Sequence, residues 1–200
     1  MVKEKIMNKI IYKKLVNILI GIGITLIVIA VGLSVYLNLV STISTRRLNG
    51  IVEKIHEILP ETTYGTWDNY TNISMPMVEI DGVNFIGLIE IPSCNVELPI
   101  YSEWDNRQIF KTPCRYTGSV YDGTLIIGDN DRLFVKQLNI NDSIIITDMN
   151  GYQYTYSIDT IEKINDVSTD FLTPLNNDLT IFFKESYSLE YVIIRCSIGR

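Results

Sequence analysis

An uncharged apolar run over residues 15–40 constrains this chain more than any other feature. It is longer than the roughly 20 residues that a helix needs to cross the hydrocarbon of a bilayer, and it contains only a few polar side chains. It also exceeds the roughly 7–15-residue apolar region of a cleavable signal peptide. We therefore predict an uncleaved transmembrane helix over residues 15–40, preceded by a basic tail over residues 1–14.

The charges on either side of this run predict its orientation. Five lysines and one glutamate precede it, whereas only Arg46 and Arg47 follow it closely. The positive-inside rule then keeps the N-terminus in the cytoplasm. We expect a single-pass cell-membrane protein whose C-terminal part is extracellular.

The part beyond the apolar run is acidic. The chain has 17 Lys and Arg residues and 23 Asp and Glu residues, and only one acidic residue precedes the run. Excess negative charge argues against nucleic acid and against adhesion to anionic lipid as partners. The acidity by itself names no partner.

Residues 41–76 are expected to form a juxtamembrane helix followed by a linker. Apolar residues recur at helical spacing and the pattern stops at Pro60, which predicts a helix that packs on the domain or acts as a stalk. The apolar residues of this pattern are Ile51, Val52, Ile55, Ile58 and Leu59. Residues 61–74 have no apolar period and are interpreted as a linker or loop.

The histidine and the cysteines give no support for a metal or a cofactor. His56 is the only histidine and lies in the predicted juxtamembrane helix, where a solvated or packing role is favoured. Cys94, Cys114 and Cys196 are an odd number without C-x-x-C spacing, so neither a zinc site nor a disulfide-rich fold is indicated. Three buried or half-buried thiols are favoured, and a Cys114–Cys196 bridge stays open.

Asp129, Asn130 and Asp131 suggest a calcium site, since calcium takes several oxygen ligands from such loops. The twelve-residue loop with glycine at position six and glutamate at position twelve is absent. No metal site is predicted.

Residues 77–200 are expected to form a mainly β domain. Short β-branched and aromatic runs alternate with turn residues, and Asn150-Gly151 between two runs predicts an antiparallel hairpin. Seven or eight short strands favour a closed barrel, because closure removes exposed sheet edges. The expected strands cover residues 85–91, 96–101, 124–127, 143–147, 152–164, 179–183 and 191–198.

Several motifs in this domain resemble those of sortases, the cysteine transpeptidases that attach proteins to Gram-positive cell walls. Residues 87–92 (Gly-Leu-Ile-Glu-Ile-Pro) and 98–101 (Leu-Pro-Ile-Tyr) match two strands of that family in order and spacing. The signature of a clostridial-type, class B/D-like sortase subgroup resembles residues 102–104 and 113–119. The usual hairpin motif of that subgroup resembles residues 148–151. The resemblance covers residues 85–198 and implies a sortase-like β-barrel.

The resemblance implies three catalytic groups, and none of them is present at its aligned position. A cysteine nucleophile, a histidine acid or base and an arginine donor would be needed. Lys184 stands at the cysteine position of Leu-Thr-Ile-Phe-Phe-Lys, Asp129 at the histidine position and Tyr191 at the arginine position. Arg195 matches a second arginine, and Cys114 and Cys196 match positions other than the nucleophile.

The replacements suggest a Lys184–Asp129 salt bridge, worth about 0–1 kcal/mol in a half-exposed groove. The alternative is two independent solvated charges. Asp129 could act as an acid near neutral pH only if its pKa were strongly raised, and Lys184 could act as a nucleophile only if it were strongly desolvated. Neither residue is therefore suited to replace the missing catalytic groups.

The leading hypothesis is a membrane-anchored, catalytically inactive sortase-like protein that acts as a surface peptide-binding, protein-binding or assembly module. A sorting-signal peptide, a surface protein or an active sortase is the expected partner, and an extended peptide can be held without the cysteine. The candidate groove residues are Phe182, Phe183, Tyr187 and Arg195, beside Tyr191. The alternatives are a functional transpeptidase with atypical catalytic groups, which would attach surface proteins to the cell wall or to pilin subunits, and a decayed gene product.

Overall fold

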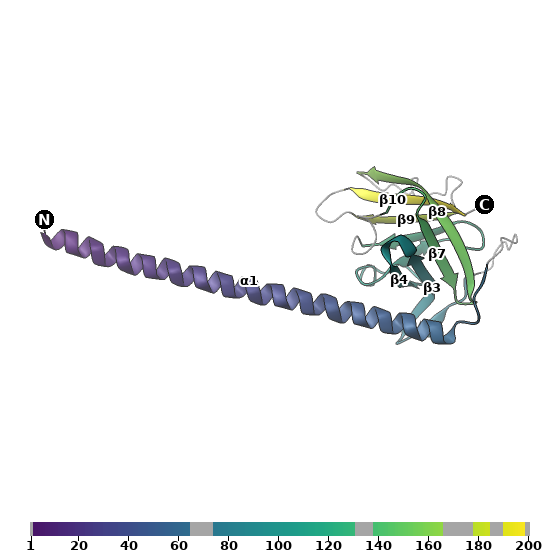
Figure 1. Cartoon of the computed structure of the whole chain (residues 1–200), viewed down its shortest axis with the longest axis horizontal. Helices are drawn as coiled ribbons and strands as arrows, with labels where there is room; N and C mark the ends of the chain where they lie inside the picture. The colour runs from purple at the N-terminus through teal and green to yellow at the C-terminus, as the bar shows by residue number, and fades with distance from the viewer. Residues whose placement is uncertain (1, 65–73, 131–137, 166–177, 185–189, 199–200) are drawn as a thin grey trace. The chain divides into compact units, whose positions relative to one another are not determined.

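The computed structural model describes residues 2–64, 74–130, 138–165, 178–184 and 190–198. The chain divides into two compact units, Met1–Arg46 and Arg47–Arg200. One long helix, α1 (Val2–Ile58), precedes a set of strands (Figure 1). The two helices expected from the sequence are thus one uninterrupted helix, because no proline precedes Pro60 to break it.

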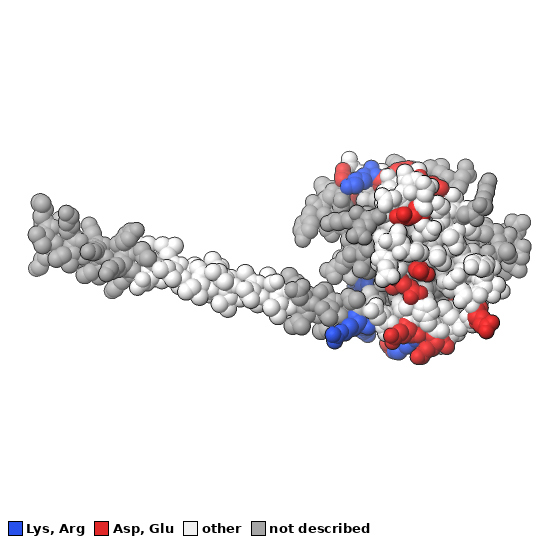
Figure 2. Space-filling view, in the orientation of Figure 1, with Lys and Arg blue, Asp and Glu red and all other residues white. Residues whose placement is uncertain are grey.

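The first unit contains the apolar part of α1. Asn17–Tyr36 has a mean hydropathy of 2.8 and none of its side chains is buried. Figure 2 shows this part of the helix without a charged side chain. A helix that is apolar all round suits lipid rather than water. This helix is long and apolar enough for a single-pass membrane anchor.

The last turns of α1 belong to the second unit and are amphipathic. Ile51, Val52 and Ile55 are buried in a cluster that includes Phe85 and Leu88 of the sheet. Of the two roles that the sequence left open for this helix, packing on the domain or a stalk, its last turns take the first. The helix ends at Ile58, just before Pro60, as the proline predicts.

The strands form a closed barrel. Eight of them pair in the order β3-β7-β8-β10-β9-β6-β5-β4 and back to β3, while β1 and β2 add to β8 and β3. The strands are β1 Thr63–Tyr64, β2 Val78–Ile80, β3 Val83–Ile91, β4 Val96–Tyr101, β5 Cys114–Thr117, β6 Leu125–Asp129, β7 Ser143–Asp148, β8 Tyr152–Ile164, β9 Leu179–Lys184 and β10 Tyr191–Ile198. The mainly β, closed-barrel prediction is confirmed.

The seven predicted strands are all present, with ends shifted by no more than two residues. The sequence did not predict β1, β2 or β5. These strands have two, three and four residues, too few to show an apolar period. A single 3-10 turn, η1 (Pro92–Cys94), joins β3 to β4 among the described residues.

The predicted Asn-Gly hairpin joins β7 to β8, which pair antiparallel. Gly151 takes the positive φ of 81° that the turn needs. Fully buried Asp148 holds the turn by accepting hydrogen bonds from the Asn150 and Tyr152 amides, each at 2.9 Å. The Tyr121 hydroxyl donates a third hydrogen bond at 2.6 Å.

Candidate functional site

The candidate site lies where β6, β9 and β10 run side by side. Successive side chains of a strand point to opposite faces of the sheet. Leu125, Ile181 and Ile194 belong to the cluster that fills the barrel, whereas Ile126 and Ile193 pack with Phe182 in a separate outer cluster. The interior face of these strands is therefore distinct from their outer face.

Lys184 and Tyr191 meet on the outer face. The two residues pair directly across β9 and β10, and the Lys184 ammonium lies 5.8 Å from the centre of the Tyr191 ring. Lys184 is exposed and Tyr191 is half-buried. The pair is a cation–π contact between neighbouring strands.

Asp129 lies on the other face, so the predicted Lys184–Asp129 salt bridge is wrong. No ion pair joins these two described side chains. Asp129 is only 5% exposed and pairs with Phe183, whose ring packs inside the barrel. Lys184 is the next residue after Phe183, and strand alternation turns its side chain away from Asp129.

Most of the predicted groove residues are buried. Phe183 is 1% exposed and fills the barrel interior, so it does not line a groove on the outer face. Phe182 and Arg195 are also buried, at 6% and 5%, although both lie on the outer side of their strands. Tyr187 lies outside the described residues.

An aromatic cluster that the sequence did not predict covers Phe182. The Trp104 ring stacks on it with centroids 5.6 Å apart and an interplanar angle of 16°. Tyr116 meets both rings edge-on, at 5.4 Å from Trp104 and 5.5 Å from Phe182. Trp104 and Tyr116 are themselves 37% and 41% exposed. The only sequence signal was the place of Trp104 in the motif over residues 102–104.

Gly128 makes room for this cluster. A Cβ at this position would lie 2.2 Å from Trp104 Cζ3 and 3.0 Å from Phe182 Cζ. Any side chain at residue 128 would therefore push the indole off the sheet. Packing against Trp104 and Phe182 therefore explains why a glycine precedes Asp129.

Residues 102–112, which we call the Trp104 segment, run from the end of β4 to just before β5. Arg115 Nε donates a 2.7 Å hydrogen bond to the Ser102 carbonyl at one end. Asp105 Oδ1 accepts hydrogen bonds from the amides of Arg107 and Gln108, at 2.6 and 3.1 Å. These two bonds lower the pKa of Asp105. The segment is thus a structured turn.

The Cys114 thiol lies beneath this segment. Cys114 pairs with Gly128 across β5 and β6. Its thiol donates a 3.6 Å hydrogen bond to the Thr112 carbonyl, and the Asp105 backbone forms a hydrogen bond with the sulfur. The thiol is fully buried, and burial raises its pKa to about 12. At neutral pH it is a protonated, poor nucleophile.

The other cysteines are also free thiols, so the Cys114–Cys196 bridge that the sequence left open is not formed. Cys196 is fully buried in the barrel interior, and burial raises its pKa. Cys94 is partly exposed and packs against the interior cluster.

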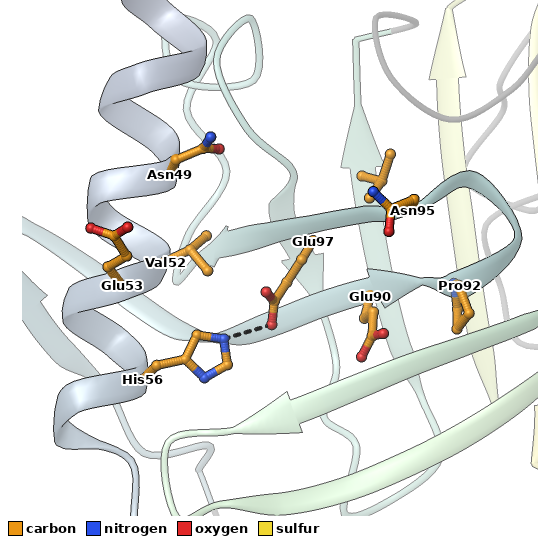
Figure 3. Close-up of a pocket in the computed structure, with 9 residues that line it drawn as sticks. Asn49, Val52, Glu53, His56, Glu90, Pro92, Asn95 and Glu97 are labelled. Carbon is orange, nitrogen blue, oxygen red and sulfur yellow. Dashed lines mark hydrogen bonds and ion pairs between the residues drawn. The ribbon is translucent and has the colours of Figure 1, made fainter.

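The only histidine belongs to a different place, an open pocket of about 590 Å³ between α1 and the β3–β4 hairpin. His56 Nε2 lies 2.8 Å from Glu97 Oε1, and Glu53 and Glu90 also line the pocket (Figure 3). His56 and Glu97 are 53% and 35% exposed. The imidazole therefore links a helix to β4 and faces solvent, in agreement with the predicted packing or solvated role.

Metal ligation has no support in the described part of the chain. No group of three or more His, Cys, Asp or Glu side chains there could hold an ion. Asp129 and Asn130 of the calcium pattern are described, but Asp131 is not.

No protein-family model and no curated protein matches the chain. Solved structures do. Sortase A from Listeria monocytogenes matches with 14% identity and a TM-score of 0.50, over 58% of this chain and 88% of that one. Sortase A from Corynebacterium diphtheriae has 21% identity and a TM-score of 0.49, and sortase C1 of GBS Pilus Island 1 has 16% and 0.49. This chain spans 62% and 64% of their lengths.

Identities this low establish the fold alone. The barrel, its strand order and the similarity to the Listeria structure agree with the expectation drawn from the motifs. The chain therefore contains a sortase-like β-barrel, which follows an apolar N-terminal helix in the sequence.

Proposed function

We propose that this chain is a membrane-anchored, catalytically inactive sortase-like protein that binds an extended peptide on the outer face of β6, β9 and β10. The N-terminal helix would anchor it, with the barrel outside the cell. A sorting-signal peptide of a surface protein is the proposed ligand, and an active sortase is a further candidate partner.

One observation carries the inactive assignment. The chain has a single histidine, and that residue lies on α1 beside Glu97, in a pocket apart from Asp129, Lys184 and Tyr191. A cysteine–histidine pair at the strand ends would need an imidazole there. The buried thiols of Cys114 and Cys196, both with raised pKa, add to this argument.

Binding is supported by the chemistry of the outer face. Exposed Lys184, half-buried Tyr191 and half-exposed Tyr116 offer a cation and an aromatic surface to a peptide. Aromatic side chains of this kind carry much of the binding energy at protein interfaces. None of these contacts requires a nucleophile.

The test separates binding from turnover in the full chain, reconstituted in neutral nanodiscs. A panel of fluorescent sorting-signal peptides with an amine acceptor should give no product above a protein-free blank, while anisotropy should show saturable binding of at least one peptide. Tyr191→Ala should weaken that binding about 3- to 10-fold, the size expected for one aromatic contact. Tyr152→Ala, on β8 and 42% exposed, is the matched control and should change nothing.

Product formation would refute the inactive assignment. A thiol-blocking reagent would then show whether Cys94, Cys114 or Cys196 is responsible. Absence of both binding and product would refute the binding module.

A further inference from the structure

The Trp104 segment covers part of the outer face on which the proposed ligand would lie. Its indole ring occupies the space above Gly128 and against Phe182, so Phe182 is 6% exposed although it lies on the outside of the barrel. The same segment covers the Cys114 thiol through Thr112 and Asp105. One stretch of chain therefore seals both an aromatic contact site and a buried thiol.

The contacts of Trp104 are those of a bound side chain. One face of the indole stacks on Phe182 and Tyr116 closes it edge-on, while 37% of the residue remains exposed. Its Nε1 donates a 3.0 Å hydrogen bond to Asn106 Oδ1 within its own segment, and no other hydrogen bond of this side chain is found among the described residues. The indole is thus held on the barrel by ring contacts.

We propose that the Trp104 segment is a displaceable cover, and that the site beneath it takes an aromatic side chain of a bound peptide in place of Trp104. Phe182 and Tyr116 would supply the stacking and edge contacts, and Gly128 the space. This inference rests on the proposed peptide binding and adds the class of side chain recognised. A ligand must then compete with Trp104, so its apparent affinity falls with the fraction of closed molecules.

Cys114 reports opening of the cover in the protein itself. In full-length protein carrying Cys94→Ser, a thiol reagent at pH 8 should label Cys114 through opening of the segment, and Cys196 only through opening of the barrel interior. Trp104→Ala should speed labelling of Cys114 at least about 10-fold, since loss of a buried aromatic pair shifts an equilibrium by that order, and should leave Cys196 unchanged. Gly128→Ala should act in the same direction, because its methyl group would displace the indole.

Phe110→Ala is the matched control for these variants. Phe110 belongs to the same segment and is 58% exposed, so its loss should not change either labelling rate. Equal acceleration of Cys114 and Cys196 by Trp104→Ala would mean that the indole only stabilises the barrel, and no acceleration of Cys114 would mean that it holds nothing closed. Either result would contradict the proposal that the Trp104 segment is a displaceable cover.

The site itself is tested with a labelled six-residue peptide that copies residues 101–106 (Tyr-Ser-Glu-Trp-Asp-Asn) and a counterpart with alanine at the tryptophan. Trp104→Ala protein should bind the tryptophan peptide at least about 10-fold more tightly than the unaltered protein does. The alanine peptide should show no such gain. A gain of the same size with the alanine peptide overturns recognition of an aromatic side chain.

The two proposals fail in different ways. If the sorting-signal panel binds equally to unaltered and Trp104→Ala protein, peptide binding stands and the cover falls. If neither protein binds any peptide, the proposed function and the site under Trp104 both fail, whatever the labelling rates show.

Discussion

The two faces of β9 differ in what their side chains do, although they alternate residue by residue. Phe183 belongs to the cluster inside the barrel, whereas Phe182 lies outside under the rings of Trp104 and Tyr116. Both rings are almost fully buried. The interior ring is enclosed by paired strands, but the outer ring is enclosed by a single connecting segment.

This difference shows that burial alone does not identify a core residue. The interior face is sealed by closure of the whole barrel, so exposing it requires unfolding. The outer face is covered by one aromatic cluster, so a local movement of the Trp104 segment would be enough to expose it. Function is therefore expected on the side that a local movement can open.

The largest expected effect comes from the interior face. Phe183→Ala should lower the free energy of unfolding by about 3–5 kcal/mol, because it removes a ring from a closely packed core. Chemical denaturation of the full chain in nanodiscs, followed by the circular dichroism of the strands, measures this. A cost below about 1 kcal/mol would mean that the barrel interior can collapse around the cavity.

The matched change on the outer face should cost less. Phe182→Ala is expected to lower the unfolding free energy by about 1–3 kcal/mol, since the half-exposed Trp104 and Tyr116 rings can move into part of the space. The same denaturation measurement compares the two variants. Equal losses would remove the distinction between the faces.

Cys114 sharpens the comparison because it lies under the cover and is as buried as an interior residue. Its pKa is raised from 9.0 to about 12. The folded state thus holds the thiol proton more tightly, so this stabilisation is complete below pH 9 and is lost as pH rises toward 12. The denaturation midpoint should fall over this window, and less steeply in Cys114→Ala.

The difference between the two proteins isolates this thiol from the tyrosines that also titrate at high pH. It should reach on the order of 1–3 kcal/mol by pH 11. Identical pH profiles would show that the thiol is already accessible to solvent.

The smallest effect concerns Lys184. A double-mutant cycle of Lys184→Met and Tyr191→Leu should give a coupling of about 0.5 kcal/mol, typical of an exposed cation–π pair. The cycle of Lys184→Met and Asp129→Asn should give a coupling near zero, because those side chains lie on opposite faces. A coupling above about 1 kcal/mol in the second cycle would contradict the strand register.

Local patterns in the sequence were sufficient for much of the fold. The apolar run over residues 15–40, the seven longer strands and the Asn150-Gly151 turn each depend on neighbouring residues, so periodicity and turn chemistry predicted them. The motif order also predicted the sortase-like barrel. Strands β1, β2 and β5 are too short to show such a pattern, and the apolar patterns alone did not predict that α1 is continuous.

The site was harder to predict because its geometry depends on contacts between distant segments. The sequence alone determined which residues stand at the ends of β6 and β9, and that no imidazole is among them. Only the tertiary structure decided that Asp129 and Lys184 face apart, that Trp104 covers Phe182 and Gly128, and that His56 reaches Glu97. The physical reason is that side-chain alternation fixes two faces along a strand, while barrel closure and the packing of loops fix what each face meets.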